Sequence, residues 1–155
     1  MTYYLATEDE YLTLGDVVLN TPAWTHTNLG DLWSGPPTRG QDIALPSAHG
    51  QRPYPRMVDA WRVTLNLAIY GDVDWSGVAY ADRRIGLWTN VDHLRANATD
   101  PPGGARGTRP LVLRLPDGST RSASAVVERF IIGSAVNYFS LLATVDIVVP
   151  EGRLT

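Results

Sequence analysis

A length of 155 residues, 44% of them hydrophobic and 19% charged, is that of one soluble globular domain that buries roughly 70% of its unfolded surface. The net charge of −3 argues against nucleic-acid binding driven by neutralisation of phosphates. No apolar run approaches the ~20 residues that a helix needs to cross a bilayer. The absence of cysteine excludes disulfides, zinc–thiolate sites and thiol nucleophiles. The N-terminal MTYYLATEDEYL carries acids in place of a basic region, so we expect no signal peptide and synthesis in the cytoplasm.

The first strand signal along the chain is a weak one, DVVLN, which begins near Asp16. Residues 30–56 follow with five prolines, four glycines and no sustained period. A loop this long is uncommon in a compact domain unless it is functional or disordered. It is also too apolar for a solvated linker, so we expect it to cover a surface of this subunit or, as we favour, of a neighbouring one.

The clearest strand signal is WRVTLNLAIYG. Large apolar residues occupy its odd positions: Trp61, Val63, Leu65, Leu67 and Ile69. Polar residues take most of the even positions. This period of two predicts a strand with one face on a core.

The next stretch, GDVDWSG at 71–77, resembles the first half of a calcium loop. Such a loop needs a bidentate Glu at position twelve, and counting from Asp72 that position is Arg83. A cation therefore stands where the strongest ligand belongs. We interpret the stretch as a turn between a strand and a helix, and expect no metal site here.

A helical period follows, over roughly 81–98. Asp82 is the expected N-cap, and DPPGG at 100–104 ends the helix. We expect Ile85 and Trp88 on its apolar side, and Trp88 in the core. Gly86 inside the helix costs up to ~1 kcal/mol relative to alanine.

After the helix the sequence predicts a hairpin and a final strand. Leu111, Leu113 and Leu115 alternate up to a turn at 116–118, and a second strand runs from about Thr120 to Ile132. The final strand places one set of apolar residues on one face: Phe139, Leu141, Ala143, Val145, Ile147 and Val149. Strands dominate, so the predicted class is mainly β, of the α+β type.

Catalytic and ligand-binding patterns are weak. The three histidines, His26, His49 and His93, make no metal-binding pair, and we expect them on the surface or in turns. The glycines of PPGGARG (101–107) lack the Lys of a phosphate loop. Exposed aromatic rings stack on sugars, so Trp24, Trp33 and Trp75 in predicted loops leave a carbohydrate-binding alternative open.

The order of these elements is similar to that of the minor tail proteins of long-tailed bacteriophages, in particular the N-terminal domain of distal tail proteins. The resemblance runs from about Leu19 to the C-terminus and begins with LNTPAW. Most of it lies in an R-G-x-D-x-x-x-P element and the residues after it: Arg39, Gly40, Asp42, Pro46, His49, Gly50 and Arg56. Related chains tend to read P-G after the element, whereas this one reads PSAHG at 46–50.

The resemblance implies a tail-tube-like fold, an antiparallel β-sandwich or split barrel flanked by one α-helix, in a single domain 1–155 with an arm at 30–56. It implies a structural virion component, assembled in the host cytoplasm, that forms a ring, commonly a homohexamer, between the tail tube and the tail tip. Its partners would be further copies of itself, the tail-tube protein, and the tail-tip hub or tape-measure protein. No catalytic residue or cofactor is implied.

A ring closes through heterologous contacts, and the 30–56 arm is the segment we expect to reach a neighbour. The predicted subunit-interface residues are Trp33, Arg39, Ile43, Leu45, Arg52, Tyr54 and Arg56. The apolar members would be buried and the arginines would pair with acids of the next copy. DNA can pass an acidic or neutral lumen without sticking, so we expect neither specific nucleic-acid binding nor membrane binding. A tail-tube or tail-terminator subunit is the nearest alternative, and a sugar-binding β-sandwich the alternative of another class.

Overall fold

The computed structural model describes residues 10–27, 60–99, 107–152 and 154–155, together with four two-residue strands between residues 38 and 58. Seven strands form one antiparallel sheet in the order β2-β1-β9-β10-β11-β8-β3. Their bounds are β1 (Tyr11–Leu14), β2 (Val17–Val18), β3 (Trp24–His26), β8 (Trp61–Tyr70), β9 (Thr108–Arg114), β10 (Thr120–Asn137) and β11 (Ser140–Val149). The predicted class, mainly β with a flanking helix, is confirmed.

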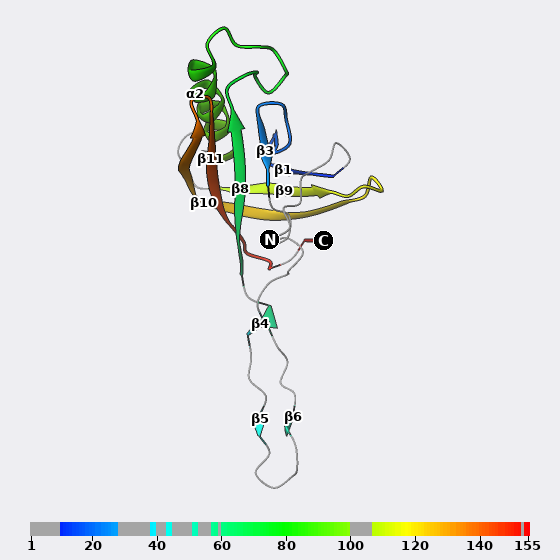
Figure 1. Ribbon diagram of the computed structural model, residues 1–155. Helices are drawn as coiled ribbons and strands as arrows, with labels where there is room; N and C mark the ends of the chain where they lie inside the picture. The colour runs from blue at the N-terminus through cyan, green and yellow to red at the C-terminus, as the bar shows by residue number, and fades with distance from the viewer. Residues whose placement is uncertain are drawn as a thin grey trace.

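The long strand β10 belongs to both halves of the sheet. Its first part pairs with β9, from Thr120 to Val126, and its second part pairs with β11 as far as Asn137. A register shift follows Val127, where β10 leaves β9. Figure 1 shows β1 and β9 running across the direction of β8 and β11, so the sheet folds over on itself at β10.

The two ends of the sheet meet through the residues that follow β2. The N–H of Leu19 donates to the carbonyl of Leu12 in β1, at 2.7 Å. The N–H of His26 in β3 donates to the carbonyl of Leu19, at 3.0 Å, and Thr21 donates to Trp24 in the same strand. Residues 19–21, which directly follow the terminal strand β2, therefore bond to its neighbour β1 and to β3 at the other end of the sheet, which closes the sheet into a barrel around the core.

The core is built by the alternation that the sequence predicts. Odd-numbered residues of β8 and β11 are buried from Trp61 to Ile69 and from Leu141 to Val149. Leu111 and Leu113 of β9 add to the same cluster. The predicted strands are therefore confirmed, although β10 extends five residues beyond the predicted end at Ile132.

Helix α2 (Arg83–Leu94) continues into a π-helical turn, η1 (Arg95–Thr99), and confirms the helix predicted at 81–98. The Asp82 carboxylate caps it, accepting from the N–H groups of Arg84 and Ile85 at 2.8 and 3.1 Å. The buried apolar side chains recur at helical spacing: Leu87, Val91, Leu94 and Ala98.

Two residues expected on the apolar side of the helix lie at the surface. Ile85 is 65% exposed and Trp88 is 41% exposed, so the apolar side assigned to them and the predicted place of Trp88 in the core are wrong. The buried stripe runs from Leu87 at intervals of three and four residues, and Ile85 and Trp88 fall on the flank of that stripe.

The segment predicted as an irregular arm at 30–56, together with the two residues after it, holds two pairs of short strands. β4 (Thr38–Arg39) pairs with β7 (Met57–Val58), and β5 (Ile43–Ala44) pairs with β6 (Gln51–Arg52), both antiparallel. The chain thus doubles back between β5 and β6, and two-residue strands are too short to leave a period in the sequence. Figure 1 shows β5 and β6 at the end of the molecule opposite α2.

Candidate interaction surface

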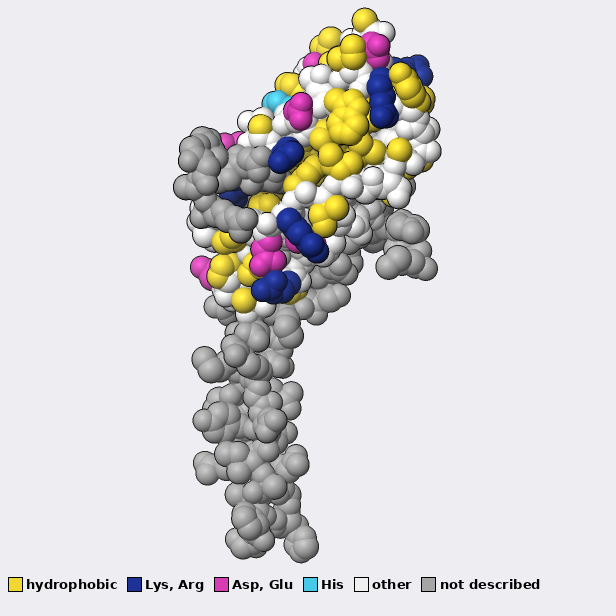
Figure 2. All heavy atoms as spheres, turned by 90° about the vertical axis from the view of Figure 1, so that its left-hand side faces the viewer, with side chains coloured by type: hydrophobic (Ala, Val, Ile, Leu, Met, Phe, Trp, Pro, Cys, Tyr) yellow, Lys and Arg dark blue, Asp and Glu magenta, His cyan; other side chains and the backbone are white. Residues whose placement is uncertain are grey.

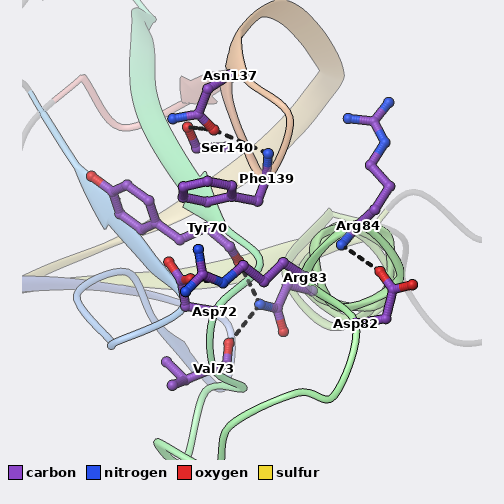
Figure 3. Close-up of polar contacts among 10 residues, drawn as sticks. Tyr70, Asp72, Val73, Asp82, Arg83, Arg84, Asn137, Phe139 and Ser140 are labelled. Atoms are coloured by element: carbon purple, nitrogen blue, oxygen red, sulfur yellow. Dashed lines mark hydrogen bonds and ion pairs between the residues drawn. The ribbon is translucent and has the colours of Figure 1, made fainter.

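The turn between β10 and β11 lies against the N-terminus of α2. The carboxamide oxygen of Asn137 closes this turn by accepting from the N–H of Phe139 at 3.0 Å and from the hydroxyl of Ser140 at 2.8 Å (Figure 3). The guanidinium of Arg83 lies 4.9 Å from the centre of the Phe139 ring. A cation over an aromatic face is attracted by the ring quadrupole, so this contact joins the turn to the helix.

Arg84 makes a second link between the same elements. Its guanidinium donates to the carbonyl of Tyr138 at 2.9 Å and lies 5.3 Å from the Tyr138 ring and 5.4 Å from the Trp88 ring. The charge is therefore held between two aromatic rings, one from the hairpin and one from the helix. This arrangement restricts all three side chains before any partner arrives.

These contacts lie within an exposed apolar region, which we name the α2 surface. Its members are Ile85, Trp88, Val136 and Tyr138, with Arg84 between the rings. Each of the four apolar side chains is more than 40% exposed. Figure 2 shows hydrophobic side chains gathered on the face that carries α2 and β10, with basic side chains among them. Apolar patches of this kind mark interaction sites more often than isolated exposed residues do.

The GDVDWSG stretch is folded as a tight turn in which both aspartates have partners within the chain. Asp74 accepts from the N–H and the hydroxyl of Ser76, at 2.9 and 2.7 Å, and these bonds are among the causes that lower its pKa, the hydroxyl's being the largest. Asp72 pairs at 3.0 Å with Arg83, the residue at the position of the missing glutamate. Among the described residues no group of three or more metal-ligating side chains is close enough to hold an ion.

One buried amide fixes this turn to the helix. Asn90 of α2 donates to the carbonyls of Tyr70 and Val73, at 2.7 and 2.8 Å, and its oxygen accepts from the Tyr80 hydroxyl at 2.9 Å. The side chain is fully buried. Sequence reasoning missed Asn90, because a single polar residue within a helical period carries no signal of its partners.

Replacing Asn90 with alanine is expected to lower the free energy of unfolding by about 2 kcal/mol, because two carbonyls and a hydroxyl lose their buried partner. Urea unfolding followed by circular dichroism measures this loss. Asn97→Ala is the control: Asn97 is exposed and its amide donates to the carbonyl of His93 at 2.8 Å, so we expect a change within about 0.5 kcal/mol. Equal losses in the two variants would contradict the role given to Asn90.

The aromatic residues considered for sugar binding have other surroundings. Trp24 is 1% exposed within β3, so its predicted place in a loop is wrong. Trp75 is exposed, but its ring stacks on His93 with the two centres 3.4 Å apart. One face of Trp75 is therefore covered. Trp33 lies outside the described residues, and the described part of the chain offers no pair of free rings in these positions.

The histidines are also less exposed than the sequence suggests. His26 is completely buried in β3, so its predicted place at the surface is wrong. Burial lowers its pKa to about 4. His93 is half-buried under Trp75, and burial lowers its pKa as well. His49 and most of the PPGGARG stretch lie outside the described residues.

The outward face of the sheet carries balanced charges. Arg62 of β8 pairs with Glu128 at 3.0 Å, and Arg129 pairs with Asp146, which also accepts from the hydroxyl of Thr64 at 2.8 Å. The hydrogen bond from Arg129 is the main cause that lowers the pKa of Asp146. These pairs are largely solvated and contribute little to stability. They leave no excess of either sign on this part of the face.

The predicted interface residues fall in the part of the chain that is least described. Trp33, Leu45, Tyr54 and Arg56 lie outside the described residues. For Arg39 in β4, Ile43 in β5 and Arg52 in β6, only the strand pairing of the backbone is described.

The sequence matches no protein-family model and no curated protein. The described residues include no helix that is both long and apolar enough to span a membrane. The functional argument therefore depends on the fold, the arm and the α2 surface.

Proposed function

We propose that this chain is a structural subunit of a bacteriophage tail that associates with copies of itself into a ring connecting the tail tube to the tail tip. In this proposal a closed barrel with one flanking helix is the body of each subunit, and the arm is the connection to a neighbour. Its other partners are the tail-tube protein and the tail-tip hub or tape-measure protein. A tail-tube or tail-terminator position is the alternative within the same class.

The observation that carries the proposal is the arm. Its strand pairs β4–β7 and β5–β6 are antiparallel and follow one another along a doubled chain, and β5–β6 lies far from α2 (Figure 1). An isolated two-stranded hairpin is marginally stable in water. The sequence of the arm nevertheless contains Ile43, Leu45 and Tyr54, which gain stability only against a further apolar surface.

Deleting residues 31–54 is expected to convert an assembling protein into a monomer. Size-exclusion chromatography with light scattering measures the mass of each species, and negative-stain microscopy shows whether the wild-type particles are closed rings. The deletion leaves out none of the strands of the barrel, so its circular dichroism should retain the β signal. Stable monomers for both wild type and deletion at high concentration would overturn the proposal.

A further inference from the structure

We infer that the open edge of β10 pairs, antiparallel, with the same edge of a second copy of this chain around a twofold axis at Ile131. This contact is separate from the arm, so the inference goes beyond the proposed function. Three features support it: the backbone groups of β10 that lack a partner, the side chains beside them, and the register in which two copies fit.

Each half of β10 has an edge that no full strand covers, because β10 belongs to both halves of the sheet. β9 pairs with the first half only as far as Val126, and β11 pairs with the second half. In the first half the chain holds this edge itself, since Ser122 and Thr155 exchange two hydrogen bonds at 2.8 and 2.9 Å. From Val127 to Asn137 no described strand pairs with the edge opposite β11. In Figure 1 this part of β10 is the margin of the half that contains β11 and β8.

The ladder between β8 and β11 shows which residues of β11 face β10. The N–H of Gly71 donates to the carbonyl of Phe139 at 2.8 Å, and the same register continues through β8 and β11. In an antiparallel pair, the residues that exchange hydrogen bonds alternate along each strand. The odd-numbered residues of β11 therefore bond to β8, and the even-numbered ones direct their backbone groups to β10.

The same alternation identifies the free backbone groups of β10. Arg129 and Ile131 lie opposite even-numbered residues of β11, so their backbone groups bond to that strand. Phe130 and Ile132 therefore direct their N–H and C=O groups to the open edge. Among the described residues these groups have no hydrogen-bond partner. An extended polypeptide strand is the kind of partner that satisfies such a row of groups.

The edge carries exposed apolar side chains and lacks the usual protection against pairing. Ile131 is 37% exposed, Ile132 is 41% exposed, and Phe130 is half-buried. Proteins protect such edges with proline, lysine or bulges. Residues 127–137, VERFIIGSAVN, contain neither proline nor lysine. Register shifts occur before Arg129 and after Ile132, so the residues between these two bulges form a regular strand that is left open to a partner.

A twofold axis at Ile131 brings the free groups of two copies together. Phe130 of each copy then lies opposite Ile132 of the other, and each of these pairs exchanges two hydrogen bonds. An aromatic ring beside a branched side chain is a favourable cross-strand pair. Arg129 lies opposite Gly133, which has no side chain to compete with it. In this register Arg129 faces no like charge, whereas a shift that places it opposite its own copy would be unfavourable.

The contact is small and symmetric. Three residues from each strand bury far less than the ~800 Å² per partner of a stable interface. Two free subunits therefore separate at the dilution of chromatography, and a covalent link is needed to detect the pairing. A twofold contact of this kind joins one ring to the face of another, where it recurs once per subunit and the weak contacts act together.

The absence of cysteine from the chain makes cross-linking a direct test. On the twofold axis the two Ile131 residues form a non-hydrogen-bonded pair with Cα atoms about 4.5 Å apart, a distance that a disulfide can span. The Ile131→Cys protein is oxidised and run on a non-reducing gel, and we expect a linked homodimer as the main product. Leu142→Cys is the control, because Leu142 is exposed to a similar degree, 45% against 37%, but lies one strand away on β11. It should give little dimer.

A second variant separates strand pairing from chance collision. Ile132→Lys, added to Ile131→Cys, places a charged side chain beside the axis, and lysine on an edge opposes pairing. Position 132 is exposed, so the fold should be retained, which circular dichroism checks. We expect the linked fraction to fall several-fold. An undiminished link, an equal link in Leu142→Cys, or no link in Ile131→Cys would overturn the inference.

The ring is judged separately, from the mass of the wild type in light scattering. Assembly of the wild type without a link in Ile131→Cys overturns the twofold contact and leaves the ring proposal standing. A link in Ile131→Cys, with a wild type that stays monomeric, supports the twofold contact and removes the ring.

Discussion

Replacing Gly86 with alanine is expected to destabilise the fold by roughly 3 kcal/mol, although alanine is the better helix former by about 1 kcal/mol. A Cβ atom at Gly86 would lie 2.4 Å from a ring carbon of Tyr80 and 2.5 Å from the carbonyl oxygen of Gly71. One of these atoms belongs to the backbone, so a rotamer change cannot relieve the overlap. The helix must then move away from the end of β8.

Urea unfolding of Gly86→Ala against wild type measures this effect, with Gly107→Ala as the control. A Cβ atom at Gly107 would meet no described atom within 4 Å, and the backbone there does not require glycine, so alanine should be neutral or slightly stabilising. A Gly86→Ala protein as stable as wild type would show that α2 does not approach Gly71 this closely.

The same contact can be tested from its other side. A Cβ atom at Gly71 would lie 2.0 Å from the carbonyl oxygen of Arg83 and 2.8 Å from the backbone nitrogen of Leu87. Gly71→Ala should therefore also move the helix off the strand. Because both substitutions break one contact, the double variant should lose clearly less stability than the sum of the two single losses.

Gly86 shows what the sequence can and cannot reveal about this fold. The periods of two at 61–69 and 139–149 predict β8 and β11 correctly, because each strand has one buried face. The N-cap Asp82 and the helical period locate α2 for the same local reasons. From the sequence alone, by contrast, Gly86 is predicted to lower the stability of the helix. The helical segment by itself does not show that the backbone at Gly71 passes close to it there.

Only part of the α2 surface could be predicted from the sequence, for a related reason. Ile85 and Trp88 fit the apolar side of a helical period, and only the packed barrel shows that Leu87 and Val91 occupy the buried side. The contact of Arg84 with Tyr138 joins residues 54 positions apart in the sequence. The arm could be found because its Pro and Gly content and its apolar residues are local properties. Its strand pairs could not, because each is only two residues long.

His26 is expected to make the fold lose stability as the pH falls from about 6.5 to about 4. Burial lowers the pKa of the folded imidazole to about 4, while the unfolded chain has the ordinary value of 6.5. The unfolded state therefore takes up the proton first. The contribution of the neutral His26 side chain to the free energy of unfolding is fully present above pH 6.5. It declines as the pH falls through this interval and is lost below pH 4. A difference of about 2.5 in pKa corresponds to roughly 3 kcal/mol.

The effect of His26 can be isolated with His26→Leu. Among the described residues neither ring nitrogen of His26 has a hydrogen-bond partner, so leucine removes no bond made by them and keeps an apolar side chain in the core. The pKa values of Asp74, Asp117 and Asp146 are lowered in the folded chain, so their folded forms stay ionised through most of this interval and are common to both proteins. Unfolding free energies measured at pH 7 and at pH 4.5 should therefore diverge less in His26→Leu than in wild type.

His93→Gln serves as the control for this measurement. His93 is only partly buried, and we expect its replacement to retain most of the wild-type pH dependence. Identical pH dependence in wild type and His26→Leu would mean that the imidazole is not held neutral inside the barrel. In that case β3 does not close the sheet as tightly as its bonds to residues 19–21 require, because a loosely held strand would let water reach the ring.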